Sequence, residues 1–397
     1  MGQSTFPVPS SGSSTSTVLP VNASSVILDG SLTSASTYTT TVNGNGGIAY
    51  LVASDNPAKF TIGGNSYTVA SNSVSATSTV VGSSASVTVE TIYTGTPATF
   101  TASTMPSAST WTAVTYGNGY YVAVASLTTA GAYSTNGTSW TASTMLNRNW
   151  ASISYGNGYY VAVALTTNTG SYSTNGTTWT ASTMPSSSLW YGVTYGNGYY
   201  VAVSGTSTNG AYSTNGTTWT ASTMPSASSW RSVIYGNGYY VAVASGPSSA
   251  GAYSTNGTTW TASTMSSSSS WQNVTYGNGY FVAVQGDGTT AGSYSTNGTT
   301  WTASTMPSSS AWTGVTFGNG YFVANAYNAT AGAYSTNGTT WTAGTMPSAS
   351  GWDNVTYGNG KFVAVQGSST TAGAYYAFTP SSLPVNFGIY NGPTTIN

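Results

Sequence analysis

Apolar and polar residues alternate in short runs along most of the chain, and the same runs recur many times. One copy, residues 150–183, reads WASISY, GYYVAVA, GSYSTN and TTWTAST. Alternation with a period of two is typical of β-strands, and Gly-Asn-Gly and Asn-Gly links favour tight hairpin turns. Each copy therefore predicts a meander of four short antiparallel strands, called a, b, c and d below. Runs such as YYVAVA are apolar at both alternating positions, so we expect both faces of each sheet to be covered.

The copies recur about every 40 residues and are numbered here as repeats 1 to 7. Each contains the motif YGNG or, once, FGNG, which begins at Tyr116, Tyr155, Tyr195, Tyr235, Tyr276, Phe317 and Tyr357. A Trp stands five residues before each motif, and six copies also contain Ser-Thr-Asn-Gly followed by a second Trp. A repeat of this length is typical of stacked or radially arranged units. We therefore predict an all-β fold in which residues 97–378 form a seven-bladed β-propeller of four-stranded antiparallel blades. The repeated aromatic residues are expected to form the core between blades rather than a platform for sugars.

The two ends of the repeated region predict how such a ring closes. Repeat 7 stops after strand c, at Phe378, whereas residues 94–106 supply an isolated strand d before repeat 1. An N-terminal strand that completes the last blade would close the ring and remove its exposed sheet edges. The alternative is an open solenoid, which would need a capping unit at each end.

Three further segments flank the repeats. Residues 1–20 are rich in Ser, Thr and Pro and predict a flexible or docking arm, and residues 21–94 contain strand-like runs that predict a small β-sandwich-like domain for attachment. Residues 379–397 are interrupted by Pro and Gly and are interpreted as a C-terminal tail. The N-terminus lacks the features of a secretory signal, and no run approaches the ~18 apolar residues of a membrane span. We expect synthesis in the cytoplasm and no membrane span.

Charge and reactive side chains are scarce. The chain has 4 Lys or Arg, 5 Asp or Glu, and no His or Cys among 397 residues. Phosphate-tracking nucleic-acid binding needs clustered Lys and Arg, and the usual nucleophile pairs and zinc sites need His or Cys. We therefore expect no nucleic-acid partner, no metal, no cofactor and no enzymatic activity. One enzymatic alternative remains, a glycan-degrading enzyme that uses Asp287 and Asp353, whose carboxyl groups would then lie ~5 to 9.5 Å apart.

The repeats differ from one another mainly in two of their four links. The a–b and c–d turns hardly vary, whereas the b–c and d–a links do. In a four-stranded meander these two pairs of links emerge at opposite ends, which predicts a repetitive face and a diversified face. Loops on a rigid scaffold commonly carry function, so the diversified face is the candidate ligand-binding surface. Its candidate residues are Arg148, Asn149, Leu189, Tyr191, Arg231, Gln272, Asp287, Tyr327, Asn328 and Asp353. The alternative is that tandem copies drift fastest where packing is least demanding, which would leave the same pattern without a ligand.

The run YSTNGTTWT resembles the Asp-box of sialidase-type propellers, a Ser-x-Asp-x-Gly-x-x-Trp hairpin between the third and fourth strands of a blade. Here Asn replaces the Asp, for example at Asn175, and the motif is one residue shorter. Repeats that combine YGNG with STNG are similar to those of bacteriophage tail-fibre and virion proteins. Sialidase activity does not follow from the resemblance, because that family uses three clustered Arg and the repeats contain only Arg148 and Arg231.

The resemblance implies a bacteriophage virion structural protein, a tail-fibre or receptor-binding component. Residues 1–94 would dock to other virion proteins, and the propeller would present its variable loops to a host-surface glycan. Such a protein is made in the host cytoplasm and acts outside the cell as part of the virion. Phage fibres of this kind are commonly trimeric, which implies a homo-oligomer. The alternative is an architectural head fibre, capsid decoration or tail protein that contacts other virion subunits.

Overall fold

The computed structural model describes residues 25–32, 37–42, 49–54, 58–62, 65–69, 73–77, 85–91, 93–380 and 385–392, with side chains for residues 95–379. These residues form strands, turns and bends, and no helix occurs among them. The predicted arm, residues 1–20, lies outside the described residues. The chain divides into two compact units, one formed by Met1–Gly95 with Phe378–Asn397 and the other by Thr96–Ala377.

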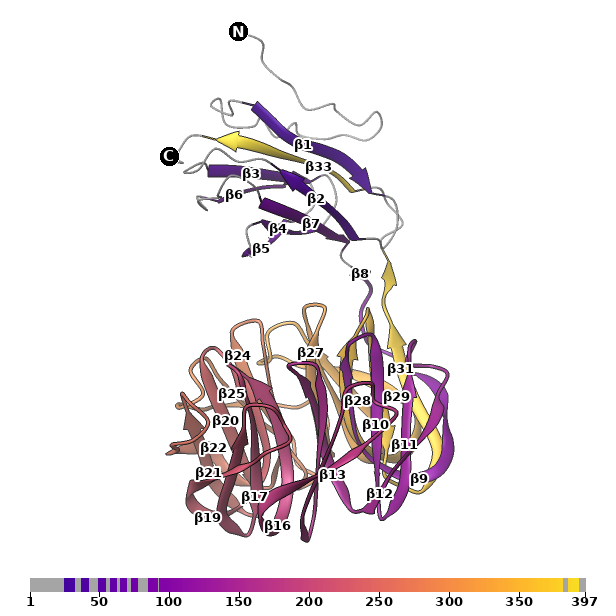
Figure 1. The fold of residues 1–397 in the computed structure, drawn as a ribbon, viewed down its shortest axis with the longest axis vertical. Coiled ribbons are helices and arrows are strands. Elements are labelled where there is room, and N and C mark those ends of the chain that lie inside the picture. The colour runs from indigo at the N-terminus through magenta and orange to yellow at the C-terminus, as the bar shows by residue number, and fades with distance from the viewer. Residues whose placement is uncertain are drawn as a thin grey trace. The chain divides into compact units, whose positions relative to one another are not determined.

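The first unit contains two four-stranded antiparallel sheets (Figure 1). Their orders are β1-β33-β3-β6 and β2-β7-β4-β5. The strands are β1 (Ser25–Leu32), β2 (Thr37–Val42), β3 (Ala49–Ser54), β4 (Ala58–Ile62), β5 (Asn65–Val69), β6 (Ser73–Thr77), β7 (Ala85–Thr91) and β33 (Val385–Gly392).

The structure differs from the prediction of a separate tail over residues 379–397. Strand β33 lies between β1 and β3 and pairs with both. Its partners stand more than 300 residues earlier, and a pairing over that separation leaves no local pattern in the sequence. Two short links also pair with each other, β8 (Tyr93–Thr94) with β32 (Thr379–Pro380).

The second unit contains the repeats, and repeat 2 shows their construction. It consists of β13 (Trp150–Gly156), β14 (Tyr159–Ala164), β15 (Thr167–Ser173) and the first part of β16 (Thr180–Gly196), which pair antiparallel in chain order. The remaining strands are β9 (Thr101–Gly117), β10 (Tyr120–Ser126), β11 (Thr128–Ser134), β12 (Thr141–Arg148), β17 (Tyr199–Gly205), β18 (Ser207–Ser213), β19 (Thr220–Gly236), β20 (Tyr239–Ser245), β21 (Ser248–Ser254), β22 (Thr261–Ser269), β23 (Trp271–Gly277), β24 (Tyr280–Gln285), β25 (Ala291–Ser295), β26 (Thr302–Thr305), β27 (Ala311–Gly318), β28 (Tyr321–Ser335), β29 (Thr342–Gly358), β30 (Lys361–Gln366) and β31 (Thr370–Ala377).

Several strands are longer than the sequence predicts. In β16 the first residues pair with β15 and the last with β17, so one strand carries strand d of repeat 2 and strand a of repeat 3. The same continuity occurs in β9, β19 and β29. Because these strands run on between repeats, the hydrogen-bonded sheets of this unit have nine, ten and four strands.

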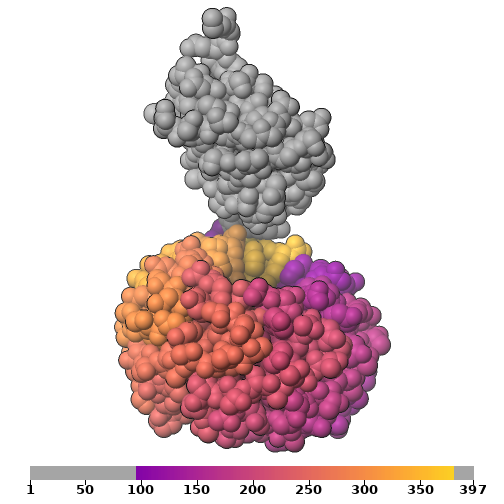
Figure 2. Space-filling view, turned by 60° about the vertical axis from the view of Figure 1, so that its left-hand side comes forward, coloured from indigo at the N-terminus to yellow at the C-terminus, as the bar shows by residue number. Residues whose placement is uncertain are grey.

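The first and last repeats are joined by the strand that precedes repeat 1, as the sequence predicted. In β9, Thr101–Thr104 and Ser109 pair with β31 of repeat 7, and residues 110–117 pair with β10 of repeat 1. Lys361 of repeat 7 also donates a hydrogen bond from Nζ to the carbonyl oxygen of Asn136 in repeat 1, at 2.8 Å. In Figure 2 the yellow last repeat lies beside the purple first repeat.

An aromatic ring from each repeat packs on a glycine of the repeat before it. A Cβ on Gly196 would lie 2.1 Å from Cγ of Tyr235, so only glycine fits under that ring. The same contact forms a complete cycle: Gly117 with Tyr155, Gly156 with Tyr195, Gly196 with Tyr235, Gly236 with Tyr276, Gly277 with Phe317, Gly318 with Tyr357, and Gly358 with Tyr116. Repeat 7 therefore contacts repeat 1 in the way that every other neighbouring pair makes contact.

Most of the repeated Trp residues and the last aromatic residue of strand b are buried, as predicted, whereas the Tyr or Phe of the YGNG motif is half-buried. The first Trp of every repeat is fully buried, and its indole N–H donates to the backbone carbonyl four residues earlier, as Trp190 does to Ser186 at 3.1 Å. Strand b contributes buried Val and Ala, together with a buried Tyr or Phe. In four repeats that residue is Tyr, and its hydroxyl donates to a glycine carbonyl of the preceding repeat, as Tyr240 does to Gly196.

The turns of the repetitive face are held by the same hydrogen bonds in each copy. In repeat 1 the backbone N–H of Gly137 donates to Ser134 Oγ at 2.8 Å, and Asn136 Oδ1 accepts from the N–H groups of Thr138 and Ser139 at 2.9 Å. The Gly has a φ of 72°, which is strained for residues with a Cβ. These local requirements explain why the Ser-Thr-Asn-Gly turns hardly vary.

Candidate functional site

The two variable kinds of link lie side by side at one end of the strands. In repeat 1 the b–c link ends at Thr128, which pairs with Arg148 of the following d–a link. Corresponding pairs join Thr167 to Ser188 and Ser207 to Ser228. The pairing brings together the segments in which the repeats differ, which confirms that they form one face.

Large apolar side chains are exposed on this face. Among residues 95–379 the exposed large hydrophobic residues are Leu127, Leu146 and Tyr327, with exposed fractions of 77%, 38% and 38%. All three lie in b–c or d–a links. Sequence reasoning identified Tyr327 but missed both leucines. The signal for Leu146 was present, because Ser186 and Ser226 occupy its place in repeats 3 and 4, where their carbonyl oxygens accept from the following Trp as that of Leu146 does.

The b–c links of this face have strained backbone. Leu127, Thr166 and Thr206 have φ values of 56°, 58° and 61°, in the left-handed region that bulky and β-branched residues strongly disfavour. Repeat 4 has Gly246 at the corresponding place, with a φ of 86°. Residues held in such conformations cost about 1–3 kcal/mol and are typical of functional loops.

Arg148 and Asn149 lie at the junction of repeats 1 and 2. Arg148 is exposed, and its Nε donates to Thr169 Oγ1 at 3.3 Å. The carbonyl oxygen of Asn149 accepts from the N–H of Leu165 at 2.9 Å, and its Oδ1 accepts from Ser126 Oγ. Both candidates are therefore fixed to neighbouring links.

Tyr191 and Arg231 form a stacked pair across repeats 3 and 4. Arg231 Cζ lies 4.5 Å from the centroid of the Tyr191 ring, a cation–π contact. The ring of Tyr191 lies over Gly205, where a Cβ would be 2.6 Å from Tyr191 Cε2. Both side chains are half-buried.

Asp353 is a half-buried carboxyl group in repeat 7 with an unusual pKa. Burial disfavours its charged form and raises its pKa from 3.8 to about 7, while Arg231 acts in the opposite direction more weakly. Room for the carboxyl group comes from Gly367, where a Cβ would lie 2.2 Å from Asp353 Oδ2. The structure therefore places two candidates from distant repeats, Arg231 and Asp353, within electrostatic range of each other.

The other predicted acid has a different environment. Asp287 is exposed in repeat 5, and its Oδ2 accepts from the backbone N–H of Ser270 at 2.6 Å. Gln272 donates from Nε2 to Ser270 Oγ at 3.0 Å, so these two candidates share a neighbour. Within the side chains that the structure describes, no group of three or more Asp, Glu, His or Cys residues could hold a metal ion.

The remaining candidates, Tyr327 and Asn328, stand on the b–c link of repeat 6. Tyr327 packs beside Gly351 of the following link, where a Cβ would lie 2.7 Å from Tyr327 Cε2. Asn328 is exposed and has a φ of 53°. Both side chains therefore belong to the diversified face, at a junction formed by repeats 6 and 7.

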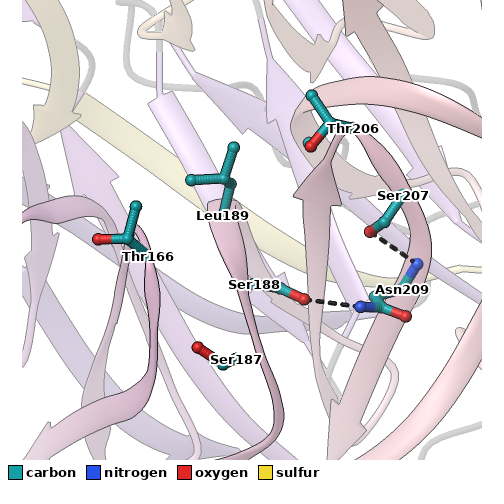
Figure 3. Close-up of a pocket in the computed structure, with 8 residues that line it drawn as sticks. Thr166, Ser187, Ser188, Leu189, Thr206, Ser207 and Asn209 are labelled. Atoms are coloured by element: carbon teal, nitrogen blue, oxygen red, sulfur yellow. Dashed lines mark hydrogen bonds between the residues drawn. The ribbon is translucent and has the colours of Figure 1, made fainter.

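A hollow of about 300 Å³ opens on the diversified face between repeats 2 and 3 (Figure 3). Its lining consists of Thr166, Ser187, Ser188, Leu189, Gly205, Thr206, Ser207 and Asn209. Asn209 Nδ2 donates to Ser188 Oγ at 2.6 Å, and its backbone N–H donates to Ser207 Oγ at 3.1 Å. Leu189 is the only predicted candidate in this lining. The signal for Asn209 was present in the sequence, since five other repeats carry Ala at its place.

Solved structures resemble this chain in fold at low sequence identity. Virginiamycin B lyase from Staphylococcus aureus matches with a TM-score of 0.63 and 12% identity over 70% of this chain and 99% of the lyase. YCF48 bound to D1 peptide matches with a TM-score of 0.57 and 14% identity over 72% and 97% of the two chains. The unit of repeats has a β-propeller fold.

The propeller similarity concerns the fold alone. A computationally designed protein, Ika8, also matches, with a TM-score of 0.50 and 10% identity over 71% of this chain and all of the designed one. No protein-family profile and no curated protein sequence matches the chain. The described part of the chain contains no helix long and apolar enough to cross a membrane. Because a propeller scaffold serves unrelated functions, the function has to be argued from the site.

Proposed function

We propose that each repeat is one four-stranded blade and that seven blades form a closed propeller. The support is the unbroken cycle of aromatic contacts from repeat 1 to repeat 7 and back, together with the strand of residues 101–104 in repeat 7. The long strands β9, β16, β19 and β29 then cross from the outer strand of one blade to the inner strand of the next. This assignment reconciles seven blades with sheets of nine and ten strands.

We propose further that the protein is a bacteriophage virion component that binds a host-surface glycan through its diversified face. The observation that carries this proposal is that the chain connections to the first unit and the variable links lie at opposite ends of the strands. Both links to the first unit leave repeat 7 where the other repeats have their c–d turn, which is the repetitive end. The diversified face carries strained links, exposed Leu and Tyr side chains, and the Tyr191–Arg231 pair. The similarity of the repeats to those of phage fibres supports the assignment to a virion.

A non-enzymatic role is part of this proposal. One neighbouring structure is a catalytically inactive variant of virginiamycin B lyase, in which a single histidine is replaced by alanine. This chain has no histidine at all, so that chemistry does not transfer to it. The carboxyl groups of Asp287 and Asp353 have different surroundings, since Asp287 is exposed and accepts from the N–H of Ser270, whereas burial raises the pKa of Asp353. The fold that this chain shares with an enzyme therefore does not imply that it shares the catalytic residues.

The test is binding of the purified full chain to a panel of bacterial strains and to their isolated surface polysaccharides. We expect saturable binding to at least one strain, little affected by added salt because the repeats carry so few charges. Replacing Tyr191, Arg231 and Tyr327 together by Ala should abolish it. The proposal loses its support if no strain or polysaccharide is bound, or if the triple variant binds as well as the original chain.

The exposed leucines favour one second candidate, an architectural virion protein. Leu127 projects into solvent from a strained link, and Leu146 is exposed on the same face. The links that carry them are neighbours, because Thr128 pairs with Arg148, and exposed apolar patches are typical of protein interfaces. A map of an intact particle that shows the diversified face buried against another subunit would favour this role over glycan binding.

A further inference from the structure

The hollow between repeats 2 and 3 occurs where several departures from the repeat meet. Asn209 replaces the Ala of five other repeats, and Leu189 replaces the small or polar residue that precedes Trp in the others. Both side chains line the same hollow (Figure 3). Independent drift would scatter such changes over seven repeats, whereas here the changes adjoin one another in space.

The junction between repeats 1 and 2 has no amide side chain at the place that corresponds to Asn209. There Arg148 stands in place of Ser188, and Thr169 stands in place of Asn209. Arg148 Nε donates to Thr169 Oγ1 at 3.3 Å, so the long side chain of Arg148 lies over the position that is hollow in repeat 3. In repeat 4 the corresponding residues are Ser228 and Ala250, which offer no amide.

The chemistry of the lining suits a small neutral polyol ring. No lining residue is charged, and the hydroxyl groups of Thr166, Ser187 and Thr206 are on exposed residues. Asn209 uses one N–H on Ser188, which holds the amide in place and leaves its carbonyl oxygen as an acceptor. Leu189 supplies an apolar surface for the C–H face of a ring. A hollow of about 300 Å³ is at the small end of ligand sites, enough for one ring rather than an extended chain.

The backbone conformation of Thr206 also supports a binding site in this hollow. Its φ of 61° is strained for Thr. Gly246 occupies the corresponding position in repeat 4, where a positive φ causes no strain because glycine has no Cβ. Retaining Thr at this position keeps a hydroxyl and a methyl group at the rim of the hollow at a cost in stability. Such an exchange of stability for a positioned side chain is typical of binding loops.

We propose that this hollow is a subsite for a single neutral hexopyranose residue, contacted by Leu189, Thr206 and Asn209. The proposal deepens the proposed glycan-binding function and rests on it for biological meaning. The binding of a soluble sugar to the hollow can nevertheless be tested without any host cell.

The experiment measures binding of D-glucose, D-galactose and D-mannose to the full chain by saturation-transfer NMR, with the open-chain polyol sorbitol as the probe that should not bind. We expect at least one hexose to bind saturably. Asn209→Ala and Leu189→Ser should each weaken it about five-fold or more, the usual effect of one lost hydrogen bond or apolar contact. Both substitutions install residues that other repeats carry or resemble, so folding should be kept, which thermal melting would verify. Ala250→Asn, the reverse change in repeat 4, is the matched control and should leave binding unchanged.

The outcomes separate the subsite from the proposed function. Absence of saturable binding to all three hexoses, or equal binding by the original chain and the Asn209→Ala and Leu189→Ser variants, overturns the subsite. Hexose binding lost in these two variants while no bacterial strain is bound would leave the subsite standing and remove the receptor-binding role. Strain binding that persists in the Asn209→Ala variant would keep that role and place recognition elsewhere on the face.

Discussion

The two ends of the propeller strands are built from the same repeats under different physical demands. At the repetitive end, Gly196 must fit beneath a Tyr ring, and Asn136 accepts two backbone hydrogen bonds within its turn. At the diversified end, Thr206 and Leu127 occupy conformations that glycine would adopt more easily. One end therefore has the residues that its local geometry requires, and the other has residues that its local geometry disfavours. Sequence drift explains why residues vary where packing is undemanding, but it does not explain why several links retain residues in strained conformations.

The largest effect should come from placing a methyl group at a glycine of the repetitive end. Gly196→Ala would bring a Cβ to 2.1 Å from Tyr235 Cγ, and the buried surroundings cannot relax by that much. We expect the free energy of unfolding to fall by about 3 kcal/mol or more, measured by chemical denaturation. Gly198→Ala is the control, since it has no neighbour within 4 Å and only its φ of 84° is unfavourable. A loss there of about 1 kcal/mol is expected. Equal losses at the two sites would contradict the packing argument.

A second prediction concerns pH and the diversified end. The folded chain holds the pKa of Asp353 at about 7, above the ordinary value of 3.8, so the folded state binds this proton more tightly than the unfolded state. The contribution of Asp353 to stability is therefore most favourable below about pH 4, declines as the pH rises to 7 and is constant above it. After allowance for partial exposure we expect a decline on the order of 2 kcal/mol. Denaturation at pH 5 and pH 8 should show it in the original chain and not in Asp353→Asn. A difference of the opposite sign would refute the assigned burial.

The tyrosine hydroxyls between repeats should have a smaller effect. Tyr240 donates a hydrogen bond to the carbonyl of Gly196, whereas repeats 5, 6 and 7 have Phe281, Phe322 and Phe362 at that place. Tyr240→Phe should lower the free energy of unfolding by about 1 kcal/mol, the usual value of one hydrogen bond. The reverse change, Phe281→Tyr, tests whether the same bond can be added. A loss above 3 kcal/mol for Tyr240→Phe would mean that the hydroxyl does more than this single bond.

The smallest effect is expected for the exposed leucine of the diversified end. Leu146→Ser installs the residue found at its place in repeats 3 and 4, Ser186 and Ser226, and Leu146 is 38% exposed. The melting temperature should therefore change little, corresponding to less than about 0.5 kcal/mol. A large loss would show that Leu146 supports the fold, and it would weaken the case that this face is kept for binding.

The sequence predicted the parts of the fold that depend on local and periodic pattern. Strand order within a repeat follows from Asn-Gly and Gly-Asn-Gly turns, and the pairing of residues 101–104 with repeat 7 follows from the missing strand at its end. The position of β33 could not be predicted, because its partners are remote in the chain.

The candidate site was predicted as a face and not as a set of contacts. Its residues Tyr191 and Arg231 occupy equivalent places in neighbouring repeats, yet nothing in the spacing shows that the guanidinium stacks on the ring. The influence of Arg231 on Asp353 depends on how distant repeats face each other around the ring. The hollow at Asn209 arises from three links packed together, and its traces in the sequence are two departures from the other repeats, Asn209 and Leu189.

The most direct test of the central claim compares one new charge at each end of the same repeat. Thr206 and Thr214 are both exposed, the first on the b–c link of the diversified face and the second in the Ser-Thr-Asn-Gly turn of the repetitive face. Binding to a recognised bacterial strain would be measured for Thr206→Glu and Thr214→Glu at equal melting temperature. The account predicts at least a ten-fold loss for Thr206→Glu and no change for Thr214→Glu. Loss of binding only in Thr214→Glu, or unchanged binding in both variants, would contradict it.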